Sequence, residues 1–264
     1  MSLCNTQMEL IYYPTSIPSW TCGYCRQGSL IKTRELVKHE PQNSIDFRKH
    51  QAWEPESIRE YFAIFYDCPH CITGSVATGQ IIQTQDYDPA TGGSRWVSCY
   101  AFQSFTVAPA IVRVEAEIPD KVEDRLQEAF SHYWTDPNAC GNAMRRCVET
   151  VLDEKKVKKQ GINRHGKRTS ITTHDRIEHH LKPKMIGAKE YLMALKWGGN
   201  SGSHGSNNSH TKAELLDMFE LLEGALVAIY GETQRKALAK KAATISRRKG
   251  RPGKTKRRKR RKTR

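Results

Sequence analysis

Residues 66–74 read YDCPHCITG, and residues 20–28, WTCGYCRQG, repeat the arrangement of two cysteines around two residues. A Cys-x-x-Cys turn places two sulfurs on one side of a metal ion, and a second turn supplies two more. The sequence therefore predicts a tetrahedral zinc site with the ligands Cys22, Cys25, Cys68 and Cys71. We expect the zinc to be structural, because four thiolates leave no position open for water.

The two pairs are 42 residues apart, which is longer than the spacing of a compact zinc ribbon. The segment between them must be an insertion that keeps both turns in register. Two alternatives stay open: two unrelated buried turns, or a redox pair of the thioredoxin type, which needs one such motif at a strand–helix junction. His70 lies inside the second turn, and we expect it to point outward without binding the metal.

Around the second pair the sequence favours β-structure. The segments 76–85 and 95–107 read as strands, and DYDPATGGS between them has turn chemistry. The segment 110–118 alternates apolar and charged residues, as a half-buried strand does. Before the second pair, Pro55 and the SIREYFAIF that follows predict a short helix.

From residue 119 the apolar residues recur at helical spacing. Asp120 and Glu123 form a capping-box pattern, and Asp136 precedes a proline that suits the first position of a second helix. A basic loop at 160–170 and two shorter helices, near 173–182 and 184–197, are expected next. Then come the polar run KWGGNSGSHGSNNSHT at 196–211, read as a loop, and a last helix that Thr211 and Glu214 open with another capping box.

The predicted fold class is α+β. We expect a zinc-binding, β-containing module at residues 1–118, a helical bundle at 119–232, and a basic tail at 233–264 that is partly helical and then disordered. No segment approaches the roughly 20 consecutive apolar residues of a membrane helix. The N-terminus lacks the basic start and apolar run of a secretory signal. We therefore expect a cytoplasmic protein without membrane contact.

The positive charge is concentrated at the C-terminus. Seventeen of the 43 Lys and Arg residues lie between Arg235 and Arg264, where there is no Asp or Glu. The first 234 residues keep 26 basic residues against all 28 acidic ones, so the body is close to neutral. Such a tail binds polyphosphates without sequence preference. The residues expected to contact DNA or RNA are Arg247, Arg248, Lys249, Arg251, Lys254, Lys256, Arg257, Arg258, Lys259, Arg260, Arg261 and Lys262.

Within this tail, Gly250-Arg251-Pro252 matches the centre of an AT-hook, a short basic insert for the DNA minor groove, although Lys249 replaces the flanking arginine. The alternative is a solubilising tail with no nucleic-acid ligand.

In the helical half, CGNAMRRCVETVLDE, LKWGGNSGSH and the closing AIYG follow CPHC and the β-rich stretch in order. Together they resemble the domain-of-unknown-function family 4145 over residues 66–232. The matching residues are Arg145, Arg146, Glu149, Gly199, Asn200 and His204. The resemblance implies a relationship to HEPN bundles, many of which are metal-independent ribonucleases that pair as dimers. It also implies a role in defence against foreign nucleic acid.

The ribonuclease motif of that superfamily is an Arg followed four to six residues later by His. Counting back from His204, the permitted positions hold Gly199, Gly198 and Trp197, and none is basic. Lys196 is one residue too far and is a poorer bidentate phosphate ligand than Arg. Arg145 or Arg146 could supply the charge instead; adjacent arginines on a helix cannot both face inward, so at most one is functional.

The predicted function is nucleic-acid binding through the basic tail. One alternative is a metal-independent endoribonuclease with His204 as general acid or base, assisted by Asn200 and Arg145; we expect a structural or binding role for His204 ahead of this one. Another is an interaction adaptor that recruits a separate effector protein. A homodimer is an expected assembly. The helix THDRIEHHLK carries several histidines, but its pairs face different directions and predict no metal site.

Overall fold

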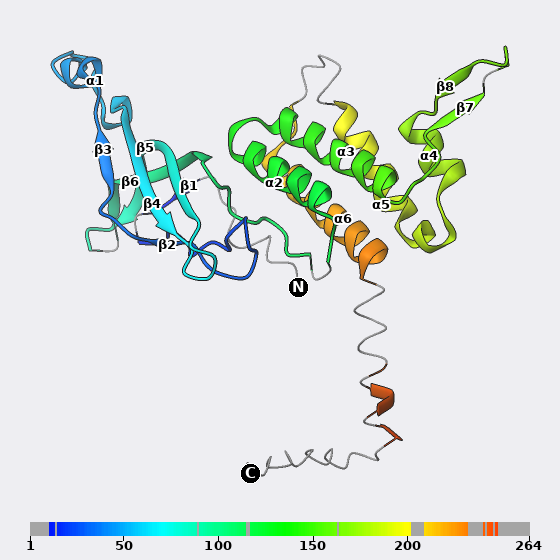
Figure 1. The fold of residues 1–264 in the computed structure, drawn as a ribbon. Helices are drawn as coiled ribbons and strands as arrows, with labels where there is room; N and C mark the ends of the chain where they lie inside the picture. The colour runs from blue at the N-terminus through cyan, green and yellow to red at the C-terminus, as the bar shows by residue number, and fades with distance from the viewer. Residues whose placement is uncertain are drawn as a thin grey trace, which may run out of the picture.

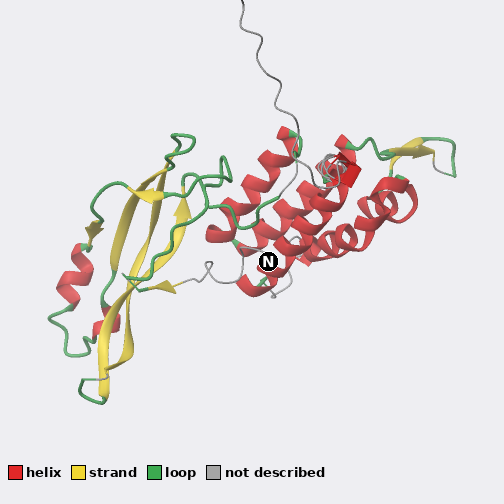
Figure 2. Cartoon of the chain, turned by 90° about the horizontal axis from the view of Figure 1, so that it is seen from below, coloured by secondary structure: helices red, strands yellow, loops and turns green. Residues whose placement is uncertain are grey.

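The computed structural model describes residues 11–13, 15–88, 90–114, 117–162, 164–201, 209–231, 240, 242–244 and 246–247. In this part of the chain an N-terminal sheet and a C-terminal helical bundle lie side by side, in both Figure 1 and Figure 2. The predicted α+β class is confirmed.

The sheet has six strands and is antiparallel throughout, in the order β1-β6-β5-β4-β2, with β3 also paired to β4. A short helix, α1 (Gln42–Phe47), and a 3-10 turn, η1 (Pro55–Ser57), lie in the connection between β3 and β4. The strands are β1 (Ile11–Tyr12), β2 (Ile31–Lys32), β3 (Val37–His39), β4 (Glu60–Asp67), β5 (Gly74–Asp88) and β6 (Gly93–Phe105).

The helix predicted after Pro55 is wrong. Helical structure ends at Ser57, and the residues that follow form β4. Phe62, Ile64 and Tyr66 are buried and alternate with more exposed neighbours, which is the period of two that a strand requires. Aromatic and branched residues suit such a pleated surface better than a helix.

The strands predicted at 76–85 and 95–107 are confirmed, and β5 and β6 extend beyond them toward their shared turn. The strand predicted at 110–118 is wrong for the described residues there, 110–114 and 117–118, which are not in a strand. Ile111 and Val112 are consecutive and both fully buried, so both faces of this connection are covered. Its Ala110 amide donates to the carbonyl of Thr21 at 3.0 Å.

The helical half follows the predicted order. Its helices are α2 (Asp120–Thr135), α3 (Pro137–Glu154), α4 (Thr173–His180), the 3-10 helix η2 (Pro183–Ala188), α5 (Lys189–Ser201) and α6 (Lys212–Tyr230). The loop expected at 160–170 instead contains a two-stranded antiparallel ribbon, β7 (Gln160–Ile162) and β8 (Arg168–Ser170). Figure 1 shows this ribbon as an arm extending beyond the bundle.

Two of the three predicted helix caps are confirmed. The Asp136 carboxylate accepts from the amides of Asn138 and Ala139 at the start of α3. Thr211 and Glu214 form a complete capping box at the start of α6. The box predicted at Asp120 is wrong, because α2 already begins at Asp120 and Pro119 is its N-cap.

One continuous core joins the sheet to the bundle. Trp20, in the segment before the first cysteine pair, is fully buried, and its ring centroid lies 5.2 Å from that of Phe105 on β6 and 6.0 Å from that of Trp134 on α2. Aromatic pairs at such distances add to the stabilisation that burial alone provides. The boundaries predicted between the three segments of the chain stay predictions.

Among the helices of the described ranges, none is long and apolar enough to cross a membrane.

Candidate metal centre

The four cysteines of the two Cys-x-x-Cys turns converge on one point. The first turn lies between Trp20 and β2, and the second connects β4 to β5. The Sγ atoms of Cys22 and Cys71 are 3.8 Å apart, those of Cys25 and Cys68 are 3.7 Å apart, and all four lie within 4.8 Å of one another. A zinc ion bound by four thiolates at about 2.3 Å has tetrahedral edges of about 3.8 Å. The donor set therefore fits zinc.

The two turns have matching backbone geometry. In each, the residue after the second cysteine donates its amide to the carbonyl of the first, Arg26 to Cys22 and Ile72 to Cys68, both at 2.8 Å. Both of these residues have positive φ, 54° for Arg26 and 62° for Ile72. Non-glycine residues rarely adopt this conformation, so its occurrence at both equivalent positions indicates a shared knuckle geometry that turns the thiols inward.

The surroundings of the thiols oppose one another electrostatically. Burial raises the pKa of the Cys22 thiol to about 12. Hydrogen bonding from the side chain of Thr73 lowers the pKa of Cys71 to about 6. The amide of Gly28 points at the sulfur of Cys25 at 3.4 Å. A bound dication would stabilise all four thiolates in this site, and binding would release protons from those thiols that are still protonated.

Convergence disfavours both alternatives to a metal site. Two unrelated buried turns have no reason to bring four sulfurs together, and a lone redox pair would use one turn only. The cysteines are free, and sulfurs 3.7 Å apart are far from the roughly 2.05 Å of a disulfide bond. His70 is exposed and stands apart from the four-sulfur group, in agreement with the expectation that it points outward.

Glycines that sequence reasoning did not single out hold the site together. A Cβ on Gly28 would lie 2.5 Å from Sγ of Cys68, so the first turn touches the second through this residue. A Cβ on Gly23 would lie 1.9 Å from the carbonyl oxygen of Ala108. The first turn is also fastened to α2, where Arg26 pairs with Glu123 at 2.8 Å. The candidate metal centre therefore lies at the junction of sheet and bundle.

The second candidate site concerns the polar run at 196–211. The structure corrects the prediction of a loop here, because α5 continues to Ser201. Gly199 permits this continuation beside α3: a Cβ at this position would lie 2.5 Å from Cβ of Arg145. Asn200 lies in the last turn of α5, with its side chain outside the described part of the structure. His204 also lies outside the described residues.

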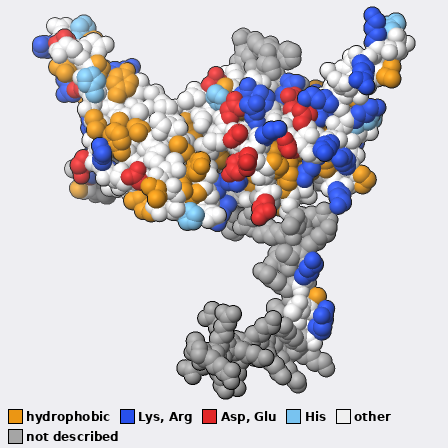
Figure 3. Space-filling view, in the orientation of Figure 1, with side chains coloured by type: hydrophobic (Ala, Val, Ile, Leu, Met, Phe, Trp, Pro, Cys, Tyr) orange, Lys and Arg blue, Asp and Glu red, His pale blue; other side chains and the backbone are white. Residues whose placement is uncertain are grey.

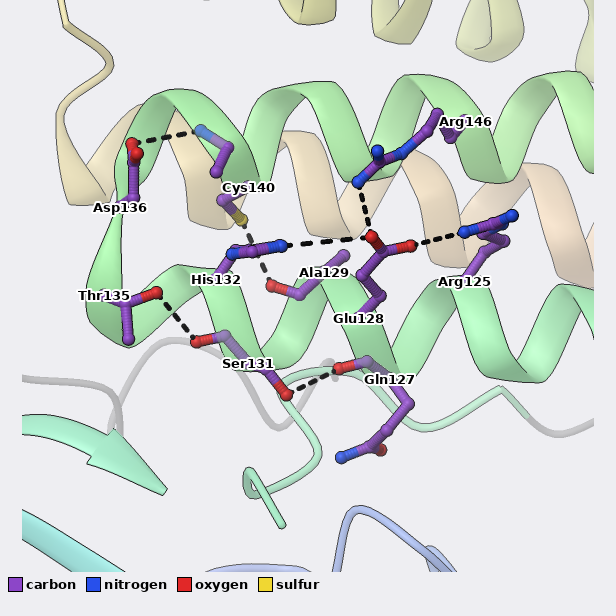
Figure 4. Close-up of polar contacts among 11 residues, drawn as sticks. Arg125, Gln127, Glu128, Ala129, Ser131, His132, Thr135, Asp136, Cys140 and Arg146 are labelled. Atoms are coloured by element: carbon purple, nitrogen blue, oxygen red, sulfur yellow. Dashed lines mark hydrogen bonds and ion pairs between the residues drawn. The ribbon is translucent and has the colours of Figure 1, made fainter. Parts of the chain in front are cut away.

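Arg145 and Arg146 face different partners. Nε of Arg145 lies 3.3 Å from Oε1 of Glu149, and the same oxygen accepts from the hydroxyl of Thr173 at 2.9 Å. Arg146 reaches across to Glu128 on α2, which also binds Arg125 (Figure 4). The expectation that adjacent arginines cannot both face inward agrees with this geometry, and Arg145 is the one beside the end of α5.

Other groups gather near this end of α5. Lys196 is 8% exposed, and its ammonium lies 3.2 Å from the ring centroid of Trp197. The ring of His174 lies 5.8 Å from that of Trp197, and Nε2 of His210 lies 2.9 Å from the carbonyl oxygen of Gly198. No spacing rule in the sequence links these residues, since they come from three separate segments. Within the described ranges, the four cysteines are the one group placed to hold a metal ion, so the histidines of α4 form no such site.

The predicted nucleic-acid contacts fall almost entirely on the tail beyond the described residues. Arg247 is exposed and helical. The others lie outside the described part: Arg248, Lys249, Arg251, Lys254, Lys256, Arg257, Arg258, Lys259, Arg260, Arg261 and Lys262.

Comparison with protein families assigns the two halves of the chain separately. Residues 127–248 match the family model described as Domain of unknown function (DUF4145). Residues 11–102 match a second model, Domain of unknown function (DUF8608). No curated protein and no solved structure matches the chain.

The resemblance to family 4145 is therefore confirmed for the helical half, although its extent differs from the predicted 66–232. The second cysteine pair and the β-rich stretch lie within the other family's match. Both halves of the four-cysteine cluster thus belong to the segment matched by DUF8608, whereas Arg145, Asn200 and His204 belong to the segment matched by DUF4145.

Proposed function

We propose that Cys22, Cys25, Cys68 and Cys71 bind one structural zinc ion. Support comes from sulfur separations close to a tetrahedral edge and from the paired knuckle geometry. Thiolate ligands favour zinc over the harder divalent cations, and a cytoplasmic location, which we also propose, would keep the thiols reduced. Elemental analysis of freshly purified protein should find about one zinc per chain, and less than about half a zinc would contradict the assignment.

We further propose that the protein binds nucleic acid through its basic C-terminal tail. The observation that carries this proposal is the separation of charge: seventeen Lys and Arg residues and no acid lie between Arg235 and Arg264, behind a body of nearly balanced charge. Such a segment releases counterions from the phosphate backbone when it binds, so affinity depends steeply on salt. The family resemblance adds a role in defence against foreign nucleic acid to this proposal.

Deletion of residues 248–264 tests the role of the tail. The deletion removes twelve basic residues and no acidic ones, and it leaves α6 and the bundle in place. At low salt we expect the truncated chain to lose most of its affinity for duplex DNA in a fluorescence anisotropy titration. Unchanged affinity after the deletion would show that the tail is not the main contact.

A second candidate function is metal-independent RNA cleavage in the helical half. The observation in its favour is that Arg145 packs against Gly199, five residues before His204 in the chain. Arginine is suited to phosphate because its planar group donates two parallel hydrogen bonds, and a histidine with a pKa near neutrality suits proton transfer.

Incubation with structured RNA in the presence of a chelator separates this candidate from simple binding. Cleavage by the unmodified chain, lost in both His204→Ala and Arg145→Ala, would establish the nuclease. RNA that stays intact with the unmodified chain would eliminate it and leave the binding function in place.

A further inference from the structure

The β7–β8 ribbon concentrates most of the positive charge of the folded body. Residues 155–170 hold seven Lys and Arg residues and no Asp or Glu. Without those seven, the first 234 residues would carry 19 basic and 28 acidic residues and would be clearly acidic. In Figure 3 the arm at the end of the bundle carries Lys and Arg side chains, with no acidic side chain visible on it. The ribbon is therefore electrostatically distinct from the rest of the body.

The ribbon is held at a fixed angle to the bundle. At the end of α3 the amide of Val157 bonds to the carbonyl of Leu152 at 2.9 Å, and that of Lys156, with φ of 53°, bonds to Asp153 at 2.8 Å. This pair of bonds is a Schellman motif, which turns the chain out of a helix in a defined direction. The carboxylate of Asp153 then pairs with Lys159 and with the buried Arg176 on α4, both at 2.7 Å.

The two faces of the ribbon differ. Residues directly opposite each other in a ladder share a face, and the faces alternate along each strand. Gly161 pairs with Thr169, and the side chain of Ile171 lies about where a Gly161 side chain would pack, 3.4 Å from the position of its Cβ. The opposite face is fully exposed and consists of two cross-strand pairs, Gln160 with Ser170 and Ile162 with Arg168.

We propose that this exposed face enters the major groove of duplex DNA, as a second contact beside the tail. The inference rests on the proposed nucleic-acid binding and assigns it a structural element. A two-stranded ribbon fits a groove about 12 Å wide. The major groove of duplex RNA is too narrow and deep for it, which favours DNA.

The residue types of the exposed face match the chemistry of base edges. Arginine donates a bidentate pair of hydrogen bonds to guanine, glutamine forms a similar pair with adenine, and serine bonds to either. Ile162 is 77% exposed on an otherwise polar arm, where an apolar side chain gains nothing from water; in the groove it would contact a thymine methyl group. Lys156 and Lys158, at the base of the ribbon, form no ion pair among the described residues and are exposed toward solvent, placed to contact phosphates.

The test compares two variants of the full chain that each lose three positive charges. The ribbon variant is Lys156→Gln with Lys158→Gln and Arg168→Gln. The control is Lys32→Gln with Arg34→Gln and Lys49→Gln, all exposed residues of the sheet half. Binding to a fluorescent duplex DNA of about 20 base pairs, two helical turns, is measured over a range of salt concentrations. The slope of log K against log salt should become shallower by about 2.7 in the ribbon variant, from about 0.9 for each lost phosphate contact, and should stay unchanged in the control.

A second probe addresses the groove. A duplex of the same sequence carrying glucosylated hydroxymethylcytosine has bulky groups in its major groove. The unmodified chain should bind this duplex more weakly than plain DNA, by at least the factor lost in the ribbon variant, and the ribbon variant should bind both duplexes equally. Equal binding of both duplexes by the unmodified chain would overturn placement in the groove, and equal dependence on the ribbon with duplex RNA would overturn the choice of DNA.

The failure of the ribbon and the failure of the proposed function give different results. If the unmodified chain binds duplex DNA and the ribbon and control variants have equal salt slopes, the ribbon makes no contact while nucleic-acid binding stands. If the unmodified chain binds no duplex at low salt, the proposed function itself is wrong.

Discussion

At the scale of single residues, Gly199 determines how closely α5 approaches α3. A Cβ at this position would lie 2.5 Å from Cβ of Arg145 and 2.8 Å from the carbonyl oxygen of Gly141, both of which are held by the α3 backbone. Real Cβ atoms do not make such contacts, so the helices would have to separate. This residue therefore couples helix packing to the segment that carries Asn200.

We predict that Gly199→Ala lowers the free energy of unfolding by about 1–3 kcal/mol, the usual cost of overpacking. Gly187→Ala serves as the control, since a Cβ there meets no atom within 4 Å and alanine restricts the unfolded chain. Urea denaturation of both variants checks the prediction. A Gly199→Ala variant as stable as Gly187→Ala would mean that α3 and α5 are not in this contact.

Lys212 provides a pH-dependent test of the same bundle. Its ammonium donates to the carbonyl of Tyr133 at the end of α2, and burial lowers the pKa of Lys212 from 10.5 to about 8. Between these values the unfolded chain holds a proton that the folded chain has lost, so raising the pH through this window favours the folded state. Below pH 8 both states are protonated, and the folded protein carries the cost of a partly buried charge.

Compared with Lys212→Met, the unmodified chain should therefore gain about 1–2 kcal/mol of stability between about pH 7 and pH 10, less than the full pKa shift implies because the side chain is partly exposed. Chemical denaturation of both proteins at the two pH values measures this difference, in which groups common to both cancel. A constant difference at both pH values would show that Lys212 is not buried as described.

At the scale of elements, the start of α6 depends on a cap that the sequence predicts well. The hydroxyl of Thr211 accepts from the amide of Glu214, and the Glu214 carboxylate accepts from the amide of Thr211. We predict that Thr211→Ala costs about 1 kcal/mol. Asp120→Ala should cost only the few tenths that a helix dipole provides, because Asp120 makes no cap bond. Thermal unfolding of the two variants should rank them in this order, and the reverse order would contradict the capping geometry.

Caps at Asp136 and Thr211 were predictable because they depend on residues three positions apart. β4 was not, because a proline followed by Glu and Ser resembles the start of a helix, whereas pairing with β5 decides its structure. The irregular connection at 110–114 was missed for a similar reason, since its burial on all sides comes from distant parts of the chain. The ribbon was predicted only as a basic loop, and its short strands carry no apolar alternation.

The four cysteines could be proposed as one site from their spacing alone, because each knuckle is a local motif. Their docking against α2 through Gly23 and Arg26 could not, since it joins residues about 100 positions apart. The contact between Arg145 and Gly199 is equally non-local, and neither residue's neighbours in sequence indicate it.

At the scale of the whole molecule, the candidate metal centre joins two segments of the chain that match different families. Metal removal should therefore affect the stability of the whole protein. We predict that a zinc chelator lowers the melting temperature by about 10 °C, as expected for a loss of about 3–5 kcal/mol in a domain of this size. Differential scanning fluorimetry with and without chelator measures the shift.

Two cysteine variants serve as controls for that shift. Cys68→Ser should already be destabilised and should not respond to the chelator. Cys99→Ser changes a buried cysteine outside the four-sulfur group and should keep the full chelator response. A Cys68→Ser variant that responds like the unmodified chain would remove the metal site from this account.

The central claim is that the protein binds nucleic acid by neutralising backbone phosphates with its tail and its ribbon. The most direct test is the affinity of the full chain for duplex DNA measured by fluorescence anisotropy over increasing salt concentration. The account predicts a linear fall of log K with log salt and a slope of about −5 or steeper, equivalent to six or more phosphate contacts. An affinity that does not change with salt, or no binding at low salt, would contradict it.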